Sequence, residues 1–303
     1  MLKKALLVGI NAYHEMPLRG CVNDVKDLQS VLCDLYQFQN ENLRVLTDKE
    51  ATRQGIIDGL KWLAEGGGEE AVRVFHYAGH GHYVPDENGG DEPDGADEAL
   101  VPYDCAKHGF LIDDHLKQLY DAFPRNGNLT LIMDCCHSGT NQRGEDEARD
   151  ITFRFMPLTF EERKAISAAR RKFNEDQRAF IMQELQGLKS TRRGPDAEME
   201  QRVDAAMKKF QKQRFGNVSL RSGNVLLAAC EDVQKAADAK FGKTYHGAFT
   251  HTLVRLLRES AGQISYFDLI EQAGEELNAL KFTQIPQLEC ENKKKDALAF
   301  SPF

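Results

Sequence analysis

Two residues of the chain have the types and surroundings of a nucleophile and its base. His80 lies between two glycines, directly after an apolar stretch that ends at Tyr77, and Cys136 follows a second apolar stretch at residues 128–133. A thiol must lose its proton to act as a nucleophile, and a neighbouring imidazole can accept that proton. The glycines around His80 allow a sharp turn and leave amides open, so the N–H groups of Gly81 and Cys136 are candidate oxyanion donors. The pattern predicts nucleophilic catalysis by a cysteine.

Each of these residues also has a plainer interpretation. A histidine between glycines can simply occupy a turn, and a cysteine at the end of a buried strand is more often an inert part of the core. Their joint placement favours chemistry, because ligands and catalytic groups of open α/β sheets collect at the carboxyl ends of the strands. His76, His82 and His137 are close in sequence, but none has so open a backbone context.

Strands and helices alternate along the segments that must position these residues. Apolar runs predict strands at 4–10, 43–46, 71–77, 128–133, 224–230 and 286–290. Amphipathic segments predict helices that begin at Asn23 or Asp24, at Thr52 and at Asp113 or Asp114, and two more at 247–259 and 266–280. The alternation predicts an α/β fold with a mostly parallel central sheet of about six strands and helices on both faces.

One charged segment interrupts this pattern. Residues 161–215 carry 14 Lys and Arg against 9 Asp and Glu, whereas the rest of the chain carries 25 against 38. The segment fits a charged helical hairpin with helices near 160–188 and 197–213, a mobile linker open to proteolysis, or both. Because the last third supplies only one or two strands, we expect a single domain made of 1–142, a charged insertion at 143–215, and 216–303, which completes the sheet.

The composition excludes several classes of protein. The 303-residue chain is 41% hydrophobic and has a net charge of −8, which argues against a general binder of nucleic acid or of membrane surfaces. No apolar run approaches the roughly 18–20 residues that span a bilayer. The apolar start of the chain ends at Asn11, so we interpret it as a first strand and not as a secretion signal.

The seven cysteines are scattered along the chain and form no CxxC pair. They indicate neither a disulfide framework nor a zinc site. A metal or redox centre at Cys135, Cys136 and His137 is disfavoured, because adjacent residues at a strand end point to opposite faces. Free thiols indicate a reducing compartment, and we expect a cytoplasmic protein.

The blocks at 76–81 (HYAGHG) and 134–139 (DCCHSG) resemble the two signature blocks of metacaspases and of their bacterial relatives, the orthocaspases. Further similar blocks occur at 18–24, 97–104, 224–230 and 247–250, and only 143–215 has no matching pattern. The resemblance implies a caspase-like fold and a monomeric cysteine endopeptidase that cuts after basic residues. It assigns His80 as general base and Cys136 as nucleophile. Cys135 occupies a position that the family does not use for catalysis.

Asp24 and Asp134 match the acidic residues that line the primary specificity pocket (S1) of this family. A buried carboxylate pair suits a guanidinium or an ammonium, and Arg is favoured because it bonds in a bidentate manner. Asp134 has the same side-chain parity as Cys136, so both can reach one cleft. Asp24 has an alternative role as a helix N-cap. Ala78 departs from family members that have a hydroxylated residue beside the histidine, which removes one possible hydrogen bond.

An acidic loop raises the question of a metal ion. Residues 83–106 contain eight Asp and Glu and no Lys or Arg, which fits either a solvated loop or oxygen ligands for a divalent cation. By resemblance, Asp97, Asp113 and Asp114 correspond to carboxylates that bind activating Ca²⁺ in metacaspases. A fourth ligand near Glu145 or Asp146 is not defined, and some orthocaspases work without Ca²⁺, so both possibilities stay open. No organic cofactor is implied.

These features lead to two hypotheses. The first is an endopeptidase for peptides and proteins with exposed Arg or Lys, which does not act on nucleic acids or membranes. Lys189, Arg192 and Arg193 suit the same specificity, so self-cleavage is expected at an undefined bond within 143–221. The second is a catalytically silent module that binds basic peptides in an acidic cleft. Intact His80 and Cys136 count against the second hypothesis, because binding alone requires neither.

Overall fold

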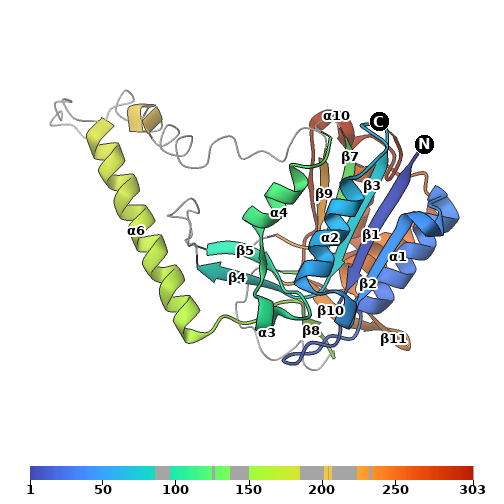
Figure 1. Cartoon of the computed structure of the whole chain (residues 1–303), viewed down its shortest axis with the longest axis horizontal. Coiled ribbons are helices and arrows are strands. Elements are labelled where there is room, and N and C mark those ends of the chain that lie inside the picture. Colours follow the sequence, from blue (N-terminus) through green and yellow to red (C-terminus); the bar gives the residue numbers. More distant parts are fainter. Residues whose placement is uncertain are drawn as a thin grey trace. The chain divides into compact units, whose positions relative to one another are not determined.

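The computed structural model describes residues 1–85, 96–124, 127–136, 150–184, 201–203, 205–206, 224–231 and 234–302 (Figure 1). The chain divides into two compact units. The larger unit contains 1–82, 98–157 and 220–303, and the smaller contains 83–97 and 158–219. Every site residue predicted from the sequence, except Asp97, belongs to the larger unit.

The central sheet has six strands in the order β12-β9-β7-β3-β1-β2 (Figure 1). All neighbouring strands are parallel except β12, which pairs antiparallel with β9. The sheet therefore confirms the predicted fold class. The strands are β1 (Lys3–Gly9), β2 (Leu43–Thr47), β3 (Val72–Ala78), β7 (Asn128–Asp134), β9 (Asn224–Ala228) and β12 (Gln287–Glu289).

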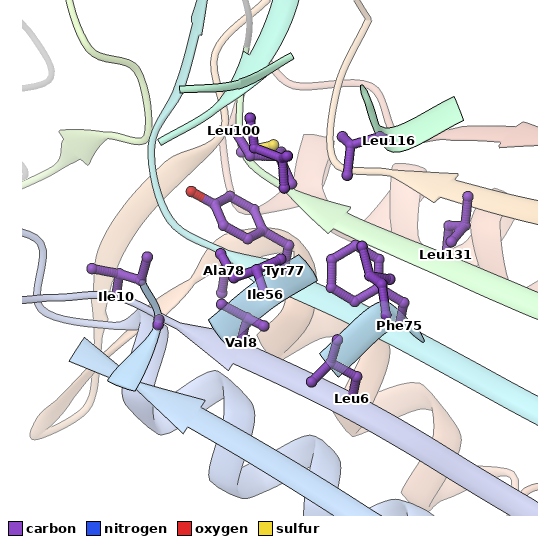
Figure 2. Close-up of a cluster of buried hydrophobic side chains, with 14 of the residues drawn as sticks. Leu6, Val8, Ile10, Ile56, Phe75, Tyr77, Ala78, Leu100, Leu116 and Leu131 are labelled. Atoms are coloured by element: carbon purple, nitrogen blue, oxygen red, sulfur yellow. The ribbon is translucent and has the colours of Figure 1, made fainter. Parts of the chain in front are cut away.

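Helices cover both faces of this sheet. On one face, the apolar side chains of Val8 and Phe75 pack in one core with Ile56 of α2 and Leu116 of α4 (Figure 2). On the other face, the Thr130 hydroxyl lies 2.6 Å from the hydroxyl of the first residue of α9. The helices are α1 (Cys21–Tyr36), α2 (Arg53–Ala64), α3 (Cys105–His108), α4 (Asp113–Tyr120), α8 (Ala248–Glu259), α9 (Tyr266–Ala279) and α10 (Asn292–Lys295), with 3-10 turns at Asn40–Asn42 and Asp48–Glu50.

The start of α2 agrees with the sequence-based prediction, whereas the start of α1 does not. Thr52 caps α2 as predicted, and its hydroxyl accepts a hydrogen bond of 3.0 Å from the Gly55 N–H. The predicted cap of α1 is wrong. That helix begins at Cys21 with Gly20 in the N-cap position and no side-chain cap. Asp24 lies in the first turn instead, and its buried carboxylate is bound by groups from distant parts of the chain.

Two small sheets were not predicted. One has the order β11-β10-β8 and the other β4-β5-β6. Their strands are short and lack a continuous apolar run, so the pattern that predicts the central sheet is absent from them. They are β4 (Gly81–Pro85), β5 (Ala96–Leu100), β6 (Leu111–Ile112), β8 (Thr152–Phe153), β10 (Ala237–Phe241) and β11 (Thr244–Gly247).

The smaller unit contains α6 (Phe160–Glu184), which agrees with the helix expected near 160–188. Thr159 and Glu162 form a capping box at its start, in which the Glu162 N–H donates to the Thr159 hydroxyl at 3.2 Å and the Thr159 N–H donates to the Glu162 carboxylate at 2.6 Å. Lys189, Arg192 and Arg193 lie outside the described residues. Within the described part of the chain, no helix is both long and apolar enough to cross a membrane.

Candidate active site

His80 follows β3 and is held by two tyrosine hydroxyls. Its N–H donates to the Tyr13 hydroxyl at 3.0 Å, and its carbonyl oxygen lies 2.8 Å from the Tyr77 hydroxyl. The same two hydroxyls explain Gly79, because a Cβ there would lie 2.5 Å from the Tyr13 hydroxyl and 2.7 Å from that of Tyr77. The hydroxyls of Tyr13 and Tyr77 therefore fix the backbone at Gly79 and His80.

The His80 ring has one nitrogen bonded and one without a partner. Nε2 lies 2.7 Å from the Met16 carbonyl oxygen, and because a carbonyl only accepts, Nε2 carries the proton. Nδ1 has no hydrogen-bond partner among the described residues. Burial lowers the pKa of His80 to about 4, so the ring is neutral at neutral pH. A neutral imidazole with an unshared electron pair on Nδ1 can accept a proton.

Cys136 and Cys135 point to opposite sides, as the strand period requires. Cys135 packs in the core shared with α2 and α4, and burial raises the pKa of its thiol well above the ordinary value. Cys136 contacts the chain just before β10. Its sulfur lies 3.6 Å from the Ala236 carbonyl oxygen and also accepts the Ala236 N–H. The thiol of Cys136 is thus on the side of the sheet that carries Asp134.

The amides predicted as oxyanion donors converge on one atom. The Gly81 N–H donates to the carbonyl oxygen of Arg154 at 3.0 Å, and the Cys136 N–H donates to the same oxygen at 3.1 Å. Since one oxygen receives both bonds, the residue after His80 and the nucleophile candidate lie side by side. The site brings the two strand ends together, as their places after β3 and β7 predict.

Asp24 and Asp134 also meet, together with a third carboxylate that the sequence did not reveal. One guanidinium nitrogen of Arg154 lies 2.5 Å from Asp24 and 3.0 Å from Asp238, and the other lies 3.0 Å from Asp134. All four side chains have no exposed surface. We call Asp24, Asp134 and Asp238 the carboxylate cluster. The cluster binds the guanidinium of Arg154, and the amides of Gly81 and Cys136 bind the carbonyl oxygen of the same residue.

The start of α8 stabilises the negative charge of this cluster. The Gly247 N–H donates to Asp24 at 3.0 Å, and Thr250 donates to Asp134 from its N–H at 3.1 Å and from its hydroxyl at 2.6 Å. Amides at a helix N-terminus favour anions. Gly247 is required at this point, because a Cβ there would overlap the side chains of both Asp134 and Arg154.

The pKa values of Asp24 and Asp134 are shifted in opposite directions. Burial alone would raise the pKa of Asp24, but the charge of Arg154 and the His246 ring, whose Nδ1 lies 3.3 Å from the carboxylate, hold it below the ordinary value. Burial dominates at Asp134 and raises its pKa to about 6, although Arg154 opposes the shift. At neutral pH the pKa values of Asp24 and Asp134 therefore favour the ionised form of both carboxyl groups.

Sequence reasoning missed Arg154 and Asp238 for a physical reason. Arg154 lies in the segment without a recognisable pattern, and Asp238 lies in a strand without an apolar run. Asp238 accepts hydrogen bonds from the amides of Arg19 at 2.8 Å and Gly20 at 2.9 Å. The only local signal in the sequence is that Asp238 lies between two alanines, Ala237 and Ala239. In the structure all three residues are buried.

The described residues do not assemble a calcium site. Asp97 is buried in β5 and Asp113 begins α4, whereas the Asp114 side chain, Glu145 and Asp146 lie outside the description. In the described part of the chain, no group of three or more His, Cys, Asp or Glu side chains is arranged to hold a metal ion.

Known proteins resemble the chain in sequence over nearly its whole length. The family model for the metacaspase peptidase C14 domain matches residues 3–143. Metacaspase-1 of Scheffersomyces stipitis is 30% identical over 98% of this chain and 73% of its own length. Metacaspase-1 of Pyricularia oryzae is 30% identical over 95% of this chain and 71% of its own. The chain belongs to the metacaspase family.

Solved structures agree with this metacaspase in fold. A protein from Geobacter sulfurreducens matches all of this chain over all of its own length, with a TM-score of 0.64 and 22% identity. Caspase-1 of Spodoptera frugiperda covers 95% of this chain and 86% of its own, with a TM-score of 0.54 and 11% identity. The metacaspase therefore has the caspase-like fold, and its family is one of cysteine-type peptidases.

Proposed function

We propose that this metacaspase is an endopeptidase that cleaves after Arg or Lys, with Cys136 as nucleophile and His80 as general base. One observation carries the proposal. The guanidinium of Arg154 pairs with the carboxylate cluster, while its carbonyl oxygen accepts hydrogen bonds from the N–H groups of Gly81 and Cys136. The site thus accommodates an arginine and its carbonyl group at the same time, as cleavage after that residue requires.

The geometry of the cluster favours Arg over Lys at the position before the cleaved bond (P1). Its carboxylates bind two different guanidinium nitrogens, with Asp134 on one and Asp24 and Asp238 on the other. A planar guanidinium can serve both directions at once, whereas an ammonium is a single point of charge on a shorter chain. We therefore expect Arg peptides to be better substrates than Lys peptides.

Groups of this chain and water account for the bonds that form and break in the reaction. His80 Nδ1 accepts the thiol proton, and the Cys136 sulfur attacks the carbonyl carbon of the P1 residue. The N–H groups of Gly81 and Cys136 stabilise the negative oxygen that develops. His80 then gives the proton to the leaving amine as the C–N bond breaks, and water hydrolyses the thioester, which restores the thiol and releases a carboxylate.

Three further expectations belong to this proposal, and the role of Ca²⁺ is tested beside them. The enzyme acts as a monomer on peptides and proteins with exposed Arg or Lys. It processes its own chain within 143–221. Its seven cysteines, none of which is in a disulfide, suit a reducing compartment such as the cytoplasm. Activation by Ca²⁺ is tested by adding the ion or a chelator to each assay.

A fluorogenic peptide with Arg at P1 tests the proposal. The wild type and Cys135→Ala should release the fluorophore, whereas Cys136→Ala and His80→Ala should lose nearly all turnover. Cys135→Ala is the matched control, because that neighbouring thiol packs in the core on the opposite side. Equal turnover by wild type and Cys136→Ala would refute the assignment. Tight binding of the peptide without turnover would favour the silent binding module.

A further inference from the structure

We propose that residues 151–156 are the protein's own bound substrate and that the Arg154–Phe155 bond is the first one it cuts. This inference rests on the proposed function and extends it, because self-processing had no defined bond. It follows that the chain folds with its active site occupied.

Before the bond, the segment is an added strand. Thr152 pairs antiparallel with Asp238, and Phe153 with Ala237. The Arg154 N–H then donates to the Ala236 carbonyl oxygen at 3.0 Å. An extended peptide that pairs with the edge of a sheet is the usual form in which a chain is recognised by its main-chain groups. This part of the segment therefore lies as a substrate would.

After the bond, the chain continues through the site. Gly81 donates its N–H to the Arg154 carbonyl and accepts the Met156 N–H at 2.9 Å, so it pairs with both sides of Phe155. The Met156 carbonyl is also bound, since His82 Nδ1 lies 2.9 Å from its oxygen. Main-chain bonds thus hold the segment on both sides of Arg154–Phe155, with the carbonyl to be attacked between them.

Side chains of the segment occupy separate sites along β10. Arg154 is enclosed by the carboxylate cluster. Ile151 and Phe153 line one pocket with Phe282, and the Lys235 ammonium lies 4.7 Å from the centre of the Phe153 ring. Alternate residues of a strand point to the same side, which matches Ile151 and Phe153 on this pocket. These contacts define expected preferences for an aromatic residue at P2 and an aliphatic residue at P4.

The arrangement goes beyond what a structural ion cluster needs. An arginine that only neutralises carboxylates requires its guanidinium, whereas Arg154 also places its carbonyl on the amides of Gly81 and Cys136. The other basic residues of the window 143–221 that the structure describes lie in helices, those from Arg163 to Arg178 in α6 and Arg202 in a further helical stretch at 201–203. A helical backbone bonds to itself and cannot pair with β10 as an extended chain does.

The proposed step is balanced within the chain. The Cys136 sulfur bonds to the carbonyl carbon of Arg154, the bond to the Phe155 nitrogen breaks, and the thiol proton passes through His80 to the new amine. Water then adds a hydroxyl group to Arg154 and returns a proton to the thiolate. Because Arg154 and its cluster have no exposed surface, no second arginine enters before this segment leaves. The first cut is therefore intramolecular.

The test follows the purified full-length chain with time, with and without Ca²⁺, and identifies new N-termini by sequencing. Wild type should yield a fragment that begins at Phe155, at a first-order rate that does not change when the protein is diluted. Cys136→Ala and Arg154→Gln should stay intact at this bond. Arg154→Lys keeps a charge in the cluster and should be cut at the same bond more slowly, so a loss of folding in the Gln variant leaves the test intact.

A mixing experiment supplies the control. Active wild type added to labelled Cys136→Ala should leave the Arg154–Phe155 bond of the labelled chain intact, and cleavage there would overturn the intramolecular step. If wild type is cut only at other bonds while it turns over the Arg peptide, the inference fails and the proposed function stands. If it cuts neither itself nor the peptide, the proposed function itself fails.

Discussion

Replacing Arg154 by Gln tests whether its guanidinium holds the carboxylate cluster together. The substitution leaves Asp24, Asp134 and Asp238 buried without their shared counter-ion. Removing one partner of a buried ion pair typically destabilises a protein by about 3–5 kcal/mol. Asp134 keeps its bonds from Thr250 and Asp238 keeps two amides, so we expect the lower end, about 3 kcal/mol. A loss of this size is a large share of a typical folding free energy of about 5–15 kcal/mol.

The loss should depend on pH with a defined sign. Without the guanidinium, burial raises the pKa of Asp24 as it already raises that of Asp134, above the ordinary value of 3.8. A carboxyl group with a raised pKa binds a proton in the folded state before it does so in the unfolded state. The folded variant therefore gains stability as the pH falls through that raised pKa. Its deficit relative to the parent should be largest at neutral pH and smaller in mild acid.

Urea unfolding, followed by the fluorescence of Trp62, the single tryptophan, measures both effects. All chains carry Cys136→Ala, so that self-cleavage does not alter the protein under study. Arg19→Gln is the matched control, since Arg19 pairs with Asp150 on the surface, where the two side chains are 39% and 53% exposed. It should cost less than about 1 kcal/mol. An Arg154→Gln midpoint equal to that of its parent, or a deficit that grows in acid, would show that Arg154 does not neutralise the cluster.

Three other outcomes follow from the structure. A fluorogenic peptide with the sequence Ile-Thr-Phe-Arg should have a kcat/KM about tenfold above the same peptide with Gly at P2, because partial burial of an aromatic ring is worth about 1.5 kcal/mol; equal values would contradict the pocket at Phe153. Gly247→Ala should raise the KM for Arg peptides and lower the Tm, because its Cβ would overlap Asp134 and Arg154, whereas Gly274→Ala in α9, whose Cβ would lie 3.7 Å from Pro286, should be tolerated. Burial lowers the pKa of His76 and of His80 from 6.5 to about 4, so the unfolded state binds protons first and the stability of the parent should fall as the pH drops from 6.5 towards 4. The raised pKa of Asp134 opposes this trend, whereas the pKa of His251, which burial also lowers, adds to it. A urea midpoint that is constant over that range would contradict the burial of both rings.

The positions of His80 and Cys136 were predictable because local patterns carry them. Apolar runs predict β3 and β7, and the carboxyl ends of neighbouring parallel strands meet at one edge of the sheet. Strand parity likewise separates Cys135 from Cys136 and puts Asp134 beside the nucleophile candidate. These inferences need only the residues of one strand and its neighbour.

Asp24 shows where local pattern is ambiguous. An aspartate near the start of a helix can cap the helix or line a pocket, and the residues next to it in the sequence are compatible with both roles. The structure excludes the cap because α1 begins at Cys21, and the carboxylate instead binds Arg154, which is 130 residues away in the chain. The partner of a buried charge is set by which segments meet, and a single helix does not contain that information.

The sequence by itself determined the alternation of strands and helices and the sheet edge that carries the cysteine and the histidine. Each of these depends on side-chain period or on residue type within one short segment. Only the tertiary structure decided that β8 adds to β10, that Asp238 joins the cluster, and that Arg154 fills the site with its carbonyl on two amides. Those contacts join short strands of weak pattern, whose pairing becomes favourable only once the central sheet has brought their main-chain groups together.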